Sequence, residues 1–375
     1  MSPHNDAPSP SGSYTAGFNR ISSFRANGSS LLSDHLMPVD AHSPLSSSYT
    51  SSNMDTSFHT DRPLVAGVYV PTVCFFDEET EDVDTATIAR HAVRLAKAGV
   101  TGLATQGSNG EAVHLTHSER QLVTATTRKA LNDAGFPHMP IIVGCGSQST
   151  RETIQLCCEA WEAGGDYALV LPPSYYASLF APSMATVMEF FNAVADASPI
   201  PIIIYNFPGA VNGMDLSSDV IVKLSQHPNI VGVKLTCGNT GKLNRVAAAT
   251  RNKRNDASKP DFLVLAGSAD FSIQSLVAGG HGILAGLANI APKACIKTIE
   301  LYNQGKHAEA QAMQEIVSQG DWTAIQGGVV GVKSGMQGWS GYGGYARSPL
   351  PKPTAEQAKK WKDGFRDLIL LEKSL

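Results

Sequence analysis

A lysine at the end of an apolar run is the residue of this chain best placed for covalent chemistry. Lys234 follows the apolar residues 230–233, and partial burial at the mouth of a barrel would favour its uncharged amine. An uncharged amine attacks a ketone and forms a protonated imine, which accepts electrons when the neighbouring carbon–carbon bond breaks. Lys234 is therefore a candidate Schiff-base residue, with an exposed lysine at a strand end as the alternative that the pattern leaves open.

Three further residues are candidates for moving protons around such an imine. Tyr205 ends the preceding apolar run, and its phenol could exchange protons with the carbinolamine if a neighbouring hydroxyl relays them. Ser108 and Tyr176 are candidates for that relay, in the segments Gly-Ser-Asn-Gly-Glu (107–111) and Pro-Pro-Ser-Tyr-Tyr (172–176). Each residue alone is better explained by packing or by a turn, but together with Lys234 they predict one site.

The elements that would bring these residues together form an alternating pattern. Eight short apolar runs, each of strand length, recur at 65–70, 100–105, 141–145, 167–171, 202–205, 230–234, 262–266 and 282–286, and stretches with helical spacing separate them. Buried parallel strands alternating with helices predict an α/β fold, a (β/α)8 TIM barrel, whose chemistry lies at the carboxyl ends of the strands. A doubly wound sheet is the alternative, but it usually has a glycine-rich turn after its first strand, and Val-Pro-Thr at 70–72 is not one.

Composition divides the chain into three parts. Residues 1–60 contain sixteen serines, two arginines and no lysine, which predicts a disordered tail. Residues 61–290 form the predicted barrel, and residues 291–375 the predicted C-terminal helical extension. Within this extension, residues 291–318 and 353–372 have helical patterns, and the glycine-rich stretch 327–344 separates them.

Charge and hydropathy exclude several classes of function. A formal net charge of −4 and the lack of any long apolar run argue against a nucleic-acid partner and against a membrane span. Six cysteines without a CxxC pair argue against a zinc knuckle, and His114 and His117 lack further ligand-like neighbours, so no metal is expected. The tail has no apolar signal segment and is interrupted by aspartates, which favours the cytoplasm and leaves mitochondrial or peroxisomal location open.

The segments around these residues resemble the dihydrodipicolinate synthase/N-acetylneuraminate lyase superfamily over about residues 63–350. The similarity lies in 107–111, in the tyrosine pair 175–176, in Tyr-Asn-Phe-Pro-Gly at 205–209 and in Asn-Ile-Val-Gly-Val-Lys at 229–234. The resemblance implies a homotetrameric barrel, a dimer of dimers, that acts on a small 2-oxo acid and on pyruvate. It also implies chemistry through a covalent lysine imine, without metal or organic cofactor.

Site roles follow from the same resemblance. Lys234 matches the Schiff-base lysine, Tyr205 the proton-transfer tyrosine and Ser108 the relay hydroxyl. Tyr176 resembles a relay tyrosine that relatives contribute across a dimer interface. The predicted substrate contacts are Gly107 and Asn109 at the pyruvate carboxylate, the backbone near Leu284 at the pyruvyl group, and Thr236, Gly267 and Ser268.

Finer similarities indicate one branch of the superfamily. Segments 106–111, 198–201, 224–229 and 341–350 are similar to 4-hydroxy-2-oxoglutarate aldolases, and 205–209 with 234–239 to fungal L-threo-3-deoxy-hexulosonate aldolases. Ala210 stands where the synthase has an arginine, which disfavours the synthase reaction. The sequence therefore predicts a class I aldolase that cleaves a 4-hydroxy-2-oxo acid to pyruvate and an aldehyde. The alternatives are a hydratase-aldolase or dehydratase on a larger 2-oxo acid, which apolar Phe207, Ala210 and Val211 would allow, and a non-catalytic binding barrel.

Overall fold

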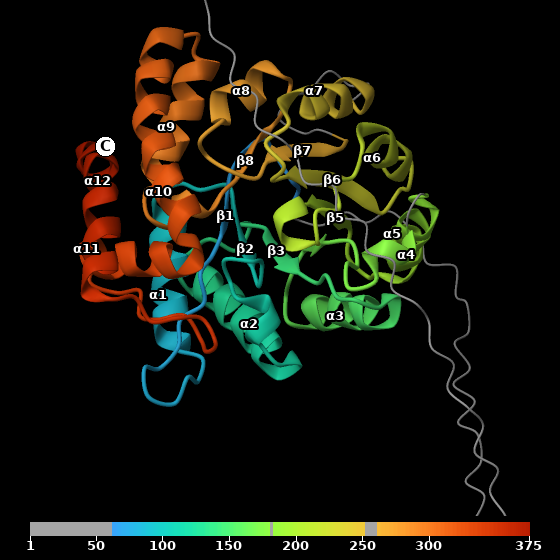
Figure 1. The fold of residues 1–375 in the computed structure, drawn as a ribbon, viewed down its shortest axis with the longest axis horizontal. Coiled ribbons are helices and arrows are strands. Elements are labelled where there is room, and N and C mark those ends of the chain that lie inside the picture. Colours follow the sequence, from blue (N-terminus) through green and yellow to red (C-terminus); the bar gives the residue numbers. More distant parts are fainter. Residues whose placement is uncertain (1–61, 181–182, 252–260) are drawn as a thin grey trace, which may run out of the picture. The chain divides into compact units, whose positions relative to one another are not determined.

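Eight parallel strands form a closed barrel in which each strand pairs with the next along the chain and β8 pairs with β1 (Figure 1). The structure, a computed structural model, describes residues 62–180, 183–251 and 261–375. The strands are β1 (Gly67–Pro71), β2 (Gly102–Thr105), β3 (Ile141–Gly144), β4 (Tyr167–Val170), β5 (Ile202–Asn206), β6 (Ile230–Leu235), β7 (Leu263–Ala266) and β8 (Gly282–Leu284). Each predicted run overlaps one of them, so the predicted barrel is confirmed; the predicted tail 1–60 lies outside the described residues.

Helices cover the outside of the barrel between successive strands. They are α1 (Thr85–Lys97), α2 (His117–Asp133), α3 (Thr150–Glu162), α4 (Ala177–Phe180), α5 (Ala185–Ala197), α6 (Ser218–Leu224), α7 (Thr240–Ala249) and α8 (Ser272–Val277). Side chains that cap the N-terminus mark the start of several of these helices. Thr116 and Glu119 form a reciprocal capping box at α2, and Ser149 accepts the Glu152 N–H at α3.

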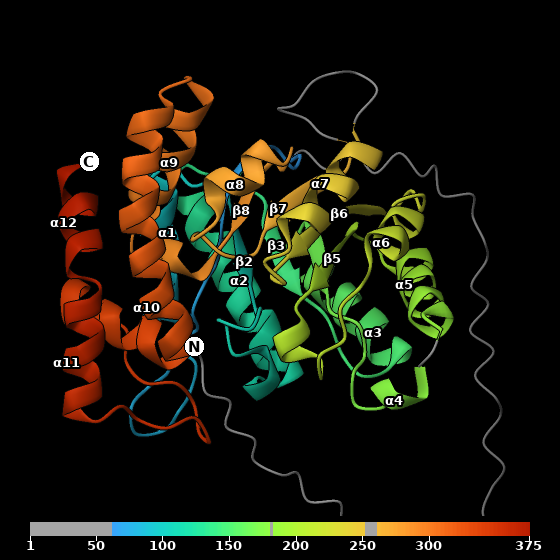
Figure 2. The ribbon, with the colours of Figure 1, turned by 45° about the horizontal axis from the view of Figure 1, so that its top comes forward.

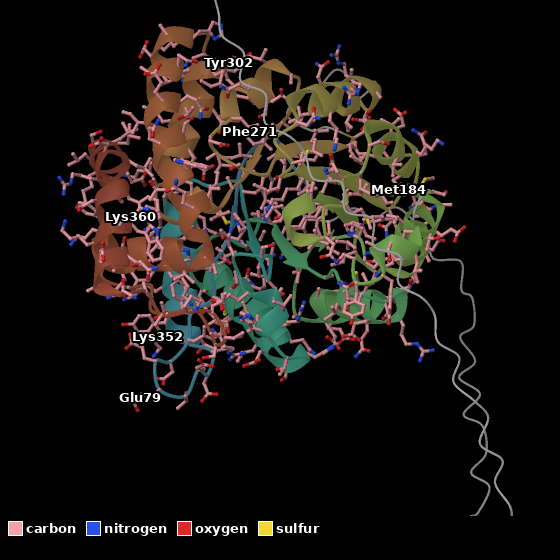
Figure 3. The ribbon with its side chains drawn as sticks, in the orientation of Figure 1. Glu79, Met184, Phe271, Tyr302, Lys352 and Lys360 are labelled. Carbon is pink, nitrogen blue, oxygen red and sulfur yellow. The ribbon has the colours of Figure 1, made fainter. Side chains whose placement is uncertain are left out.

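Two hydrophobic clusters hold this arrangement together. Strand side chains alternate between them: Ile203 and Tyr205 of β5 point into the barrel, whereas Ile202 and Ile204 pack against the surrounding helices. Side chains fill the space inside and around the ribbon (Figure 3). The interior is therefore a packed core, and open space for a ligand is left at the strand ends.

A bulge in β6 sets the direction of Lys234. Ile202 pairs with Ile230 but Ile203 pairs with Gly232, so Val231 is an extra residue in the strand. Beyond the bulge, Lys234 lies opposite Tyr205. Because neighbours in register share a face, both side chains point into the barrel.

Four further helices follow the barrel: α9 (Pro292–Asn303), α10 (His307–Ser340), α11 (Ala355–Gly364) and α12 (Arg366–Ser374). They lie together along one flank, coloured orange to red in Figure 2, and α9 also contacts β1. The predicted helical extension is thus present. No helix in the described ranges is long and apolar enough to cross a membrane.

The glycine-rich stretch was wrongly predicted as a separator, because residues 327–340 belong to α10. Gly328 kinks the helix with φ 55° and ψ −154°, a backbone conformation that essentially only glycine adopts. At Gly335 a Cβ would come within 2.5 Å of the Phe365 ring, and at Gly327 within 3.0 Å of the Trp361 indole. These glycines allow α10 to approach α11 closely, which is a packing requirement that resembles a loop signal in the sequence.

Candidate active site

A cavity of about 340 Å³ lies where the carboxyl ends of the strands meet α10. Ser108 and Asn109 follow β2, Phe207 follows β5, and Thr236 follows β6. The residues that line the cavity are Ser108, Asn109, Tyr205, Phe207, Lys234, Thr236, Gly267, Ser268, Gly286, Asp321, Ala324, Ile325, Gly328, Val329 and Val332. The structure therefore brings together seven of the ten residues predicted from the sequence.

Lys234 lies at the inner wall of this cavity with only 4% of its surface exposed. Its Nζ lies 4.2 Å from the centroid of the Tyr205 ring. Within the described part of the chain, no side chain forms an ion pair or hydrogen bond with this amine. The amine of Lys234 is thus sheltered, without a partner among the described side chains, and next to the Tyr205 ring.

Tyr205 is held by the segment that follows it. Its ring stacks on Phe207, with the ring centroids 5.7 Å apart. The side chain of Asn206 donates to Asp215 at 2.8 Å and accepts the Leu216 N–H at 2.9 Å, which ties the loop after β5 to the strand end. The ring stack and this tie restrict the position of the phenol over Lys234.

The loop that carries Ser108 and Asn109 is clamped at both ends. Gln106 and Glu111 both have positive φ, 50° and 53°, which is costly for residues with a Cβ. Gln106 is anchored through its amide, which donates to the Thr124 hydroxyl at 2.7 Å. Glu111 accepts from buried Lys333 at 3.2 Å and from the Arg347 N–H at 2.9 Å. Strained backbone held by buried polar groups is typical of a loop that positions ligand contacts.

Thr236 and Gly267 form a close contact in the cavity wall. A Cβ at Gly267 would lie 1.9 Å from the Thr236 hydroxyl oxygen, so only glycine fits there. The Thr236 hydroxyl is buried, and no described residue bonds it. A buried hydroxyl without a protein partner beside a cavity is available to a ligand.

Asp321, on α10, was not identified from the sequence. Its Oδ2 accepts three hydrogen bonds from the loop after β7: from the Ser268 hydroxyl at 2.6 Å, the Ala269 N–H at 2.8 Å and the Asp270 N–H at 3.0 Å. Burial raises the pKa of this carboxyl to about 6, although the Ser268 bond opposes the rise. The aspartate thus fixes the loop after β7 and adds a carboxylate to the cavity wall.

The other cavity residues missed by the sequence analysis also come from α10 or from the turn after β8. Ala324, Ile325, Val329 and Val332 form an apolar wall, and Gly286 approaches Asn109. No motif marks these positions, because an apolar helix face has the same pattern whether it borders a core or a ligand.

Three predicted site residues lie outside the cavity wall. Gly107 is a buried residue at the start of the loop, and Leu284 is buried inside the barrel at the end of β8. Tyr176 is 63% exposed, in a turn where the Gln148 side chain accepts the N–H groups of Ser174 and Tyr175. The roles of all ten residues stay predictions, and that of Tyr176 requires a second copy of the chain.

The two histidines considered as metal ligands, His114 and His117, contact carboxylates in the structure. His114 bonds Glu111, and His117 lies between Glu152 and Glu159 at the surface. Within the described ranges, no group of three or more His, Cys, Asp or Glu side chains is arranged to hold a metal ion.

Comparisons with known proteins agree with this architecture. The model of the dihydrodipicolinate synthetase family matches residues 64–367. A probable 4-hydroxy-2-oxoglutarate aldolase, mitochondrial, from Emericella nidulans is 56% identical over 315 residues, which cover 84% of this chain and 98% of the relative. An L-threo-3-deoxy-hexylosonate aldolase from Aspergillus niger is 49% identical, with the same two shares covered.

A solved structure is similar over most of the fold. It is a prophage protein of the dihydrodipicolinic acid synthase family from E. coli K12, solved in complex with pyruvate. The TM-score is 0.73 at 26% sequence identity, with 81% of this chain and 99% of that chain covered.

Proposed function

The chain belongs to the dihydrodipicolinate synthetase family, and on that premise we propose that it is a class I aldolase that cleaves a 4-hydroxy-2-oxo acid into pyruvate and an aldehyde. The observation that carries the proposal is the unpaired amine of Lys234 beside Tyr205 in a cavity at the strand ends. The two relatives named above act on 4-hydroxy-2-oxoglutarate and on L-threo-3-deoxy-hexulosonate by their names, and both compounds are 4-hydroxy-2-oxo acids.

Cleavage begins with a covalent bond to the lysine. The Lys234 amine attacks the C2 ketone, the carbinolamine loses water, and a protonated imine results. Tyr205 passes protons during the dehydration and then accepts the proton of the 4-hydroxyl. As that proton leaves, the C3–C4 bond breaks, the aldehyde departs, and the bonding electrons move into the imine to give an enamine.

Release of pyruvate reverses the first steps. The enamine takes a proton at C3, water adds to the imine carbon, and pyruvate leaves as Lys234 regains its free amine. Ser108, Asn109 and backbone N–H groups of their loop are proposed to hold the pyruvate carboxylate. The imine itself accepts the electrons, so the mechanism includes no organic cofactor and no metal.

The test is the mass of the intact chain after incubation with pyruvate and sodium borohydride, which reduces an imine to a stable adduct. We expect one reduced pyruvyl group on the wild-type chain and none on Lys234→Ala. Lys129→Ala, which removes an exposed lysine on α2, serves as the matched control and should be labelled like the wild type. An adduct that persists in Lys234→Ala, or none on the folded wild-type chain, would reject the mechanism.

We also propose that the active form is a homotetramer in which Tyr176 reaches the site of a neighbouring copy. Support comes from the exposure of Tyr175, Tyr176 and Leu179, three large side chains close together in the chain at one edge of the barrel. Sedimentation analysis alongside activity tests this, because a monomer with full activity would contradict a shared site.

The compartment is a separate proposal. The cytoplasmic location predicted from the tail competes with a mitochondrial one, which the name of the Emericella nidulans relative favours. Imaging of the full chain fused at its C-terminus to a fluorescent protein distinguishes the two.

A further inference from the structure

We propose that Asp321 makes this site selective for 4-hydroxy-2-oxo acids whose tail beyond C4 carries hydroxyl groups, and that it rejects those with a second carboxylate. The inference rests on the proposed aldolase function and narrows its substrate class. It favours an uncharged, polyhydroxylated tail, as in a 2-keto-3-deoxy sugar acid, over the dicarboxylate 4-hydroxy-2-oxoglutarate.

The geometry of Asp321 leaves one carboxylate oxygen for a ligand. The side chain is 97% buried, as only 3% of its surface is exposed, and it lines the cavity. Three donors from the loop after β7 occupy Oδ2. Oδ1 has no hydrogen-bond partner among the residues that the structure describes, so a substrate hydroxyl could donate to it.

The charges around the cavity oppose a second carboxylate. Lys234 is the only cationic side chain among the described residues that line the cavity, and the reaction uses its nitrogen in the imine. Asp270 belongs to the same loop, and the Oδ1 of its carboxylate is buried without a described partner. Burial raises the pKa of Asp321 to about 6, so this carboxyl is mainly ionised at pH 7.5. An anionic tail would therefore meet negative charge and no free cation.

The same wall suits hydroxyl groups. A hydroxyl can donate to Asp321 Oδ1 and accept from the unpartnered hydroxyl of Thr236, a residue that lines the same cavity. Because both protein groups lack other partners at those atoms, a tail without hydroxyls would leave them unpaired. The polar part of the wall is thus suited to bind hydroxyl groups, and Val329 and Val332 contribute apolar surface to the same wall.

The test compares cleavage of the two candidate substrates, L-threo-3-deoxy-hexulosonate and 4-hydroxy-2-oxoglutarate, by the full chain at pH 7.5. Both release pyruvate, which lactate dehydrogenase reports through oxidation of NADH. We expect kcat/KM to be at least about tenfold higher for the sugar acid, since a missing or repelled polar contact in a closed site costs this much or more. A wild-type preference for the dicarboxylate would overturn the inference.

The variant Asp321→Asn has nearly the same shape but no charge. We expect it to lower the ratio of the two kcat/KM values by about tenfold, through a loss on the sugar acid and a gain on the dicarboxylate. Glu315→Gln makes the same chemical change at an exposed position of α10 and should keep the wild-type ratio. An unchanged ratio in folded Asp321→Asn would also overturn the inference, and if that variant does not fold, the wild-type preference decides.

Trapping with pyruvate and borohydride separates this inference from the proposed function. A chain that forms the Lys234 adduct but prefers the dicarboxylate is an aldolase without the proposed selectivity. A folded chain that forms no adduct would overturn both.

Discussion

Thr236 carries a buried hydroxyl without a partner among the described residues, and Asp321 carries a carboxylate oxygen, Oδ1, for which the described residues offer no hydrogen bond. Burying such an atom costs free energy unless a partner replaces water. Both residues line the cavity, where a ligand can supply the partner. We therefore expect the unpaired Thr236 hydroxyl to lower the stability of the free protein slightly, and both residues to contribute to the binding of a polar substrate.

Replacement of Thr236 by valine separates these two effects. Thr236→Val removes the unpaired hydroxyl at nearly constant volume, so we expect the free energy of unfolding to stay the same or rise by up to about 1 kcal/mol. We expect kcat/KM to fall about tenfold, as one substrate hydrogen bond is lost. Urea denaturation and pyruvate release measure the two quantities.

A matched control is Thr153→Val, because the buried Thr153 hydroxyl accepts the Ser147 N–H at 3.2 Å and donates to the Ser149 carbonyl at 2.9 Å. It should lose about 1 kcal/mol of stability without a direct effect on substrate contacts. A Thr236→Val chain that loses as much stability as this control would show that its hydroxyl has a structural role.

The pKa of Asp321 predicts a pH-dependent contribution to stability. Burial raises it from 3.8 to about 6 in the folded chain, so the folded state binds the proton more tightly than the unfolded state. The contribution of Asp321 is therefore largest at acidic pH and declines as the pH rises from about 4 through about 6. The charged group facing it, Asp270, is present in both proteins when wild type and Asp321→Asn are compared.

The measurement is the difference in free energy of unfolding between wild type and Asp321→Asn from pH 4 to pH 8. We expect the wild-type chain to lose stability relative to the variant as the pH rises. A difference that is constant or moves in the other direction would contradict a raised pKa.

At the scale of elements, the bulge in β6 decides what the barrel can do. Regular alternation from Ile230 would turn Lys234 outward, since residues an even number apart share a face. The extra residue at Val231 shifts the register by one, and Lys234 then lies opposite Tyr205. Gly232 makes this possible, because a Cβ there would come within 2.8 Å of the Leu263 carbonyl oxygen.

Gly232→Ala should therefore disturb both packing and chemistry. We expect a loss of about 1 to 3 kcal/mol in the free energy of unfolding from overpacking against β7. We also expect the borohydride-trapped adduct to form more slowly. Lys234 lies two residues after Gly232 on the same strand, so a shift of the strand at Gly232 would displace Lys234. Gly241→Ala in α7 is the control, as its Cβ would make only ordinary contacts at 3.4 Å or more. Equal adduct rates and stabilities for the two variants would refute the role given to the bulge.

At the scale of the whole described fold, one buried ion pair links the barrel to the C-terminal helices. Lys333 on α10 is fully buried and lies 3.2 Å from Glu111, at the end of the loop that carries Ser108 and Asn109. Its ammonium also donates to the Tyr345 carbonyl and lies 4.7 Å from the centroid of the Phe76 ring. Burial lowers the pKa of Lys333, and the Glu111 carboxylate opposes that change.

Lys333→Met should lower the free energy of unfolding by about 3 kcal/mol, because it leaves the Glu111 carboxylate buried without its cation. The double variant with Glu111→Gln should recover part of that loss, since no uncompensated charge remains. Denaturant unfolding of the single and double variants gives the comparison. If Glu111→Gln lowers the free energy of unfolding as much in the Lys333→Met chain as in the wild-type chain, the two residues act independently.

The sequence by itself determined the order of the elements and the residues with chemical potential. Apolar runs of strand length alternate with helical spacing, and this pattern permits few folds other than a parallel barrel. Because strand ends share one face of a barrel, Lys234, Tyr205 and Ser108 were predicted to meet, and the structure places all three at one cavity. These features depend on local periodicity, which a sequence displays directly.

Only the tertiary structure decided the direction of the Lys234 side chain, the contribution of α10 to the cavity wall and the exposed position of Tyr176. The bulge at Val231 depends on pairing with two neighbouring strands. Asp321 reaches the cavity because α10 packs across the strand ends, and Gly327, Gly331 and Gly338 are helical where Trp361 and Lys362 of α11 lie against them. Such contacts join residues far apart in the chain, and they depend on shape complementarity, which leaves no periodic signal in the sequence.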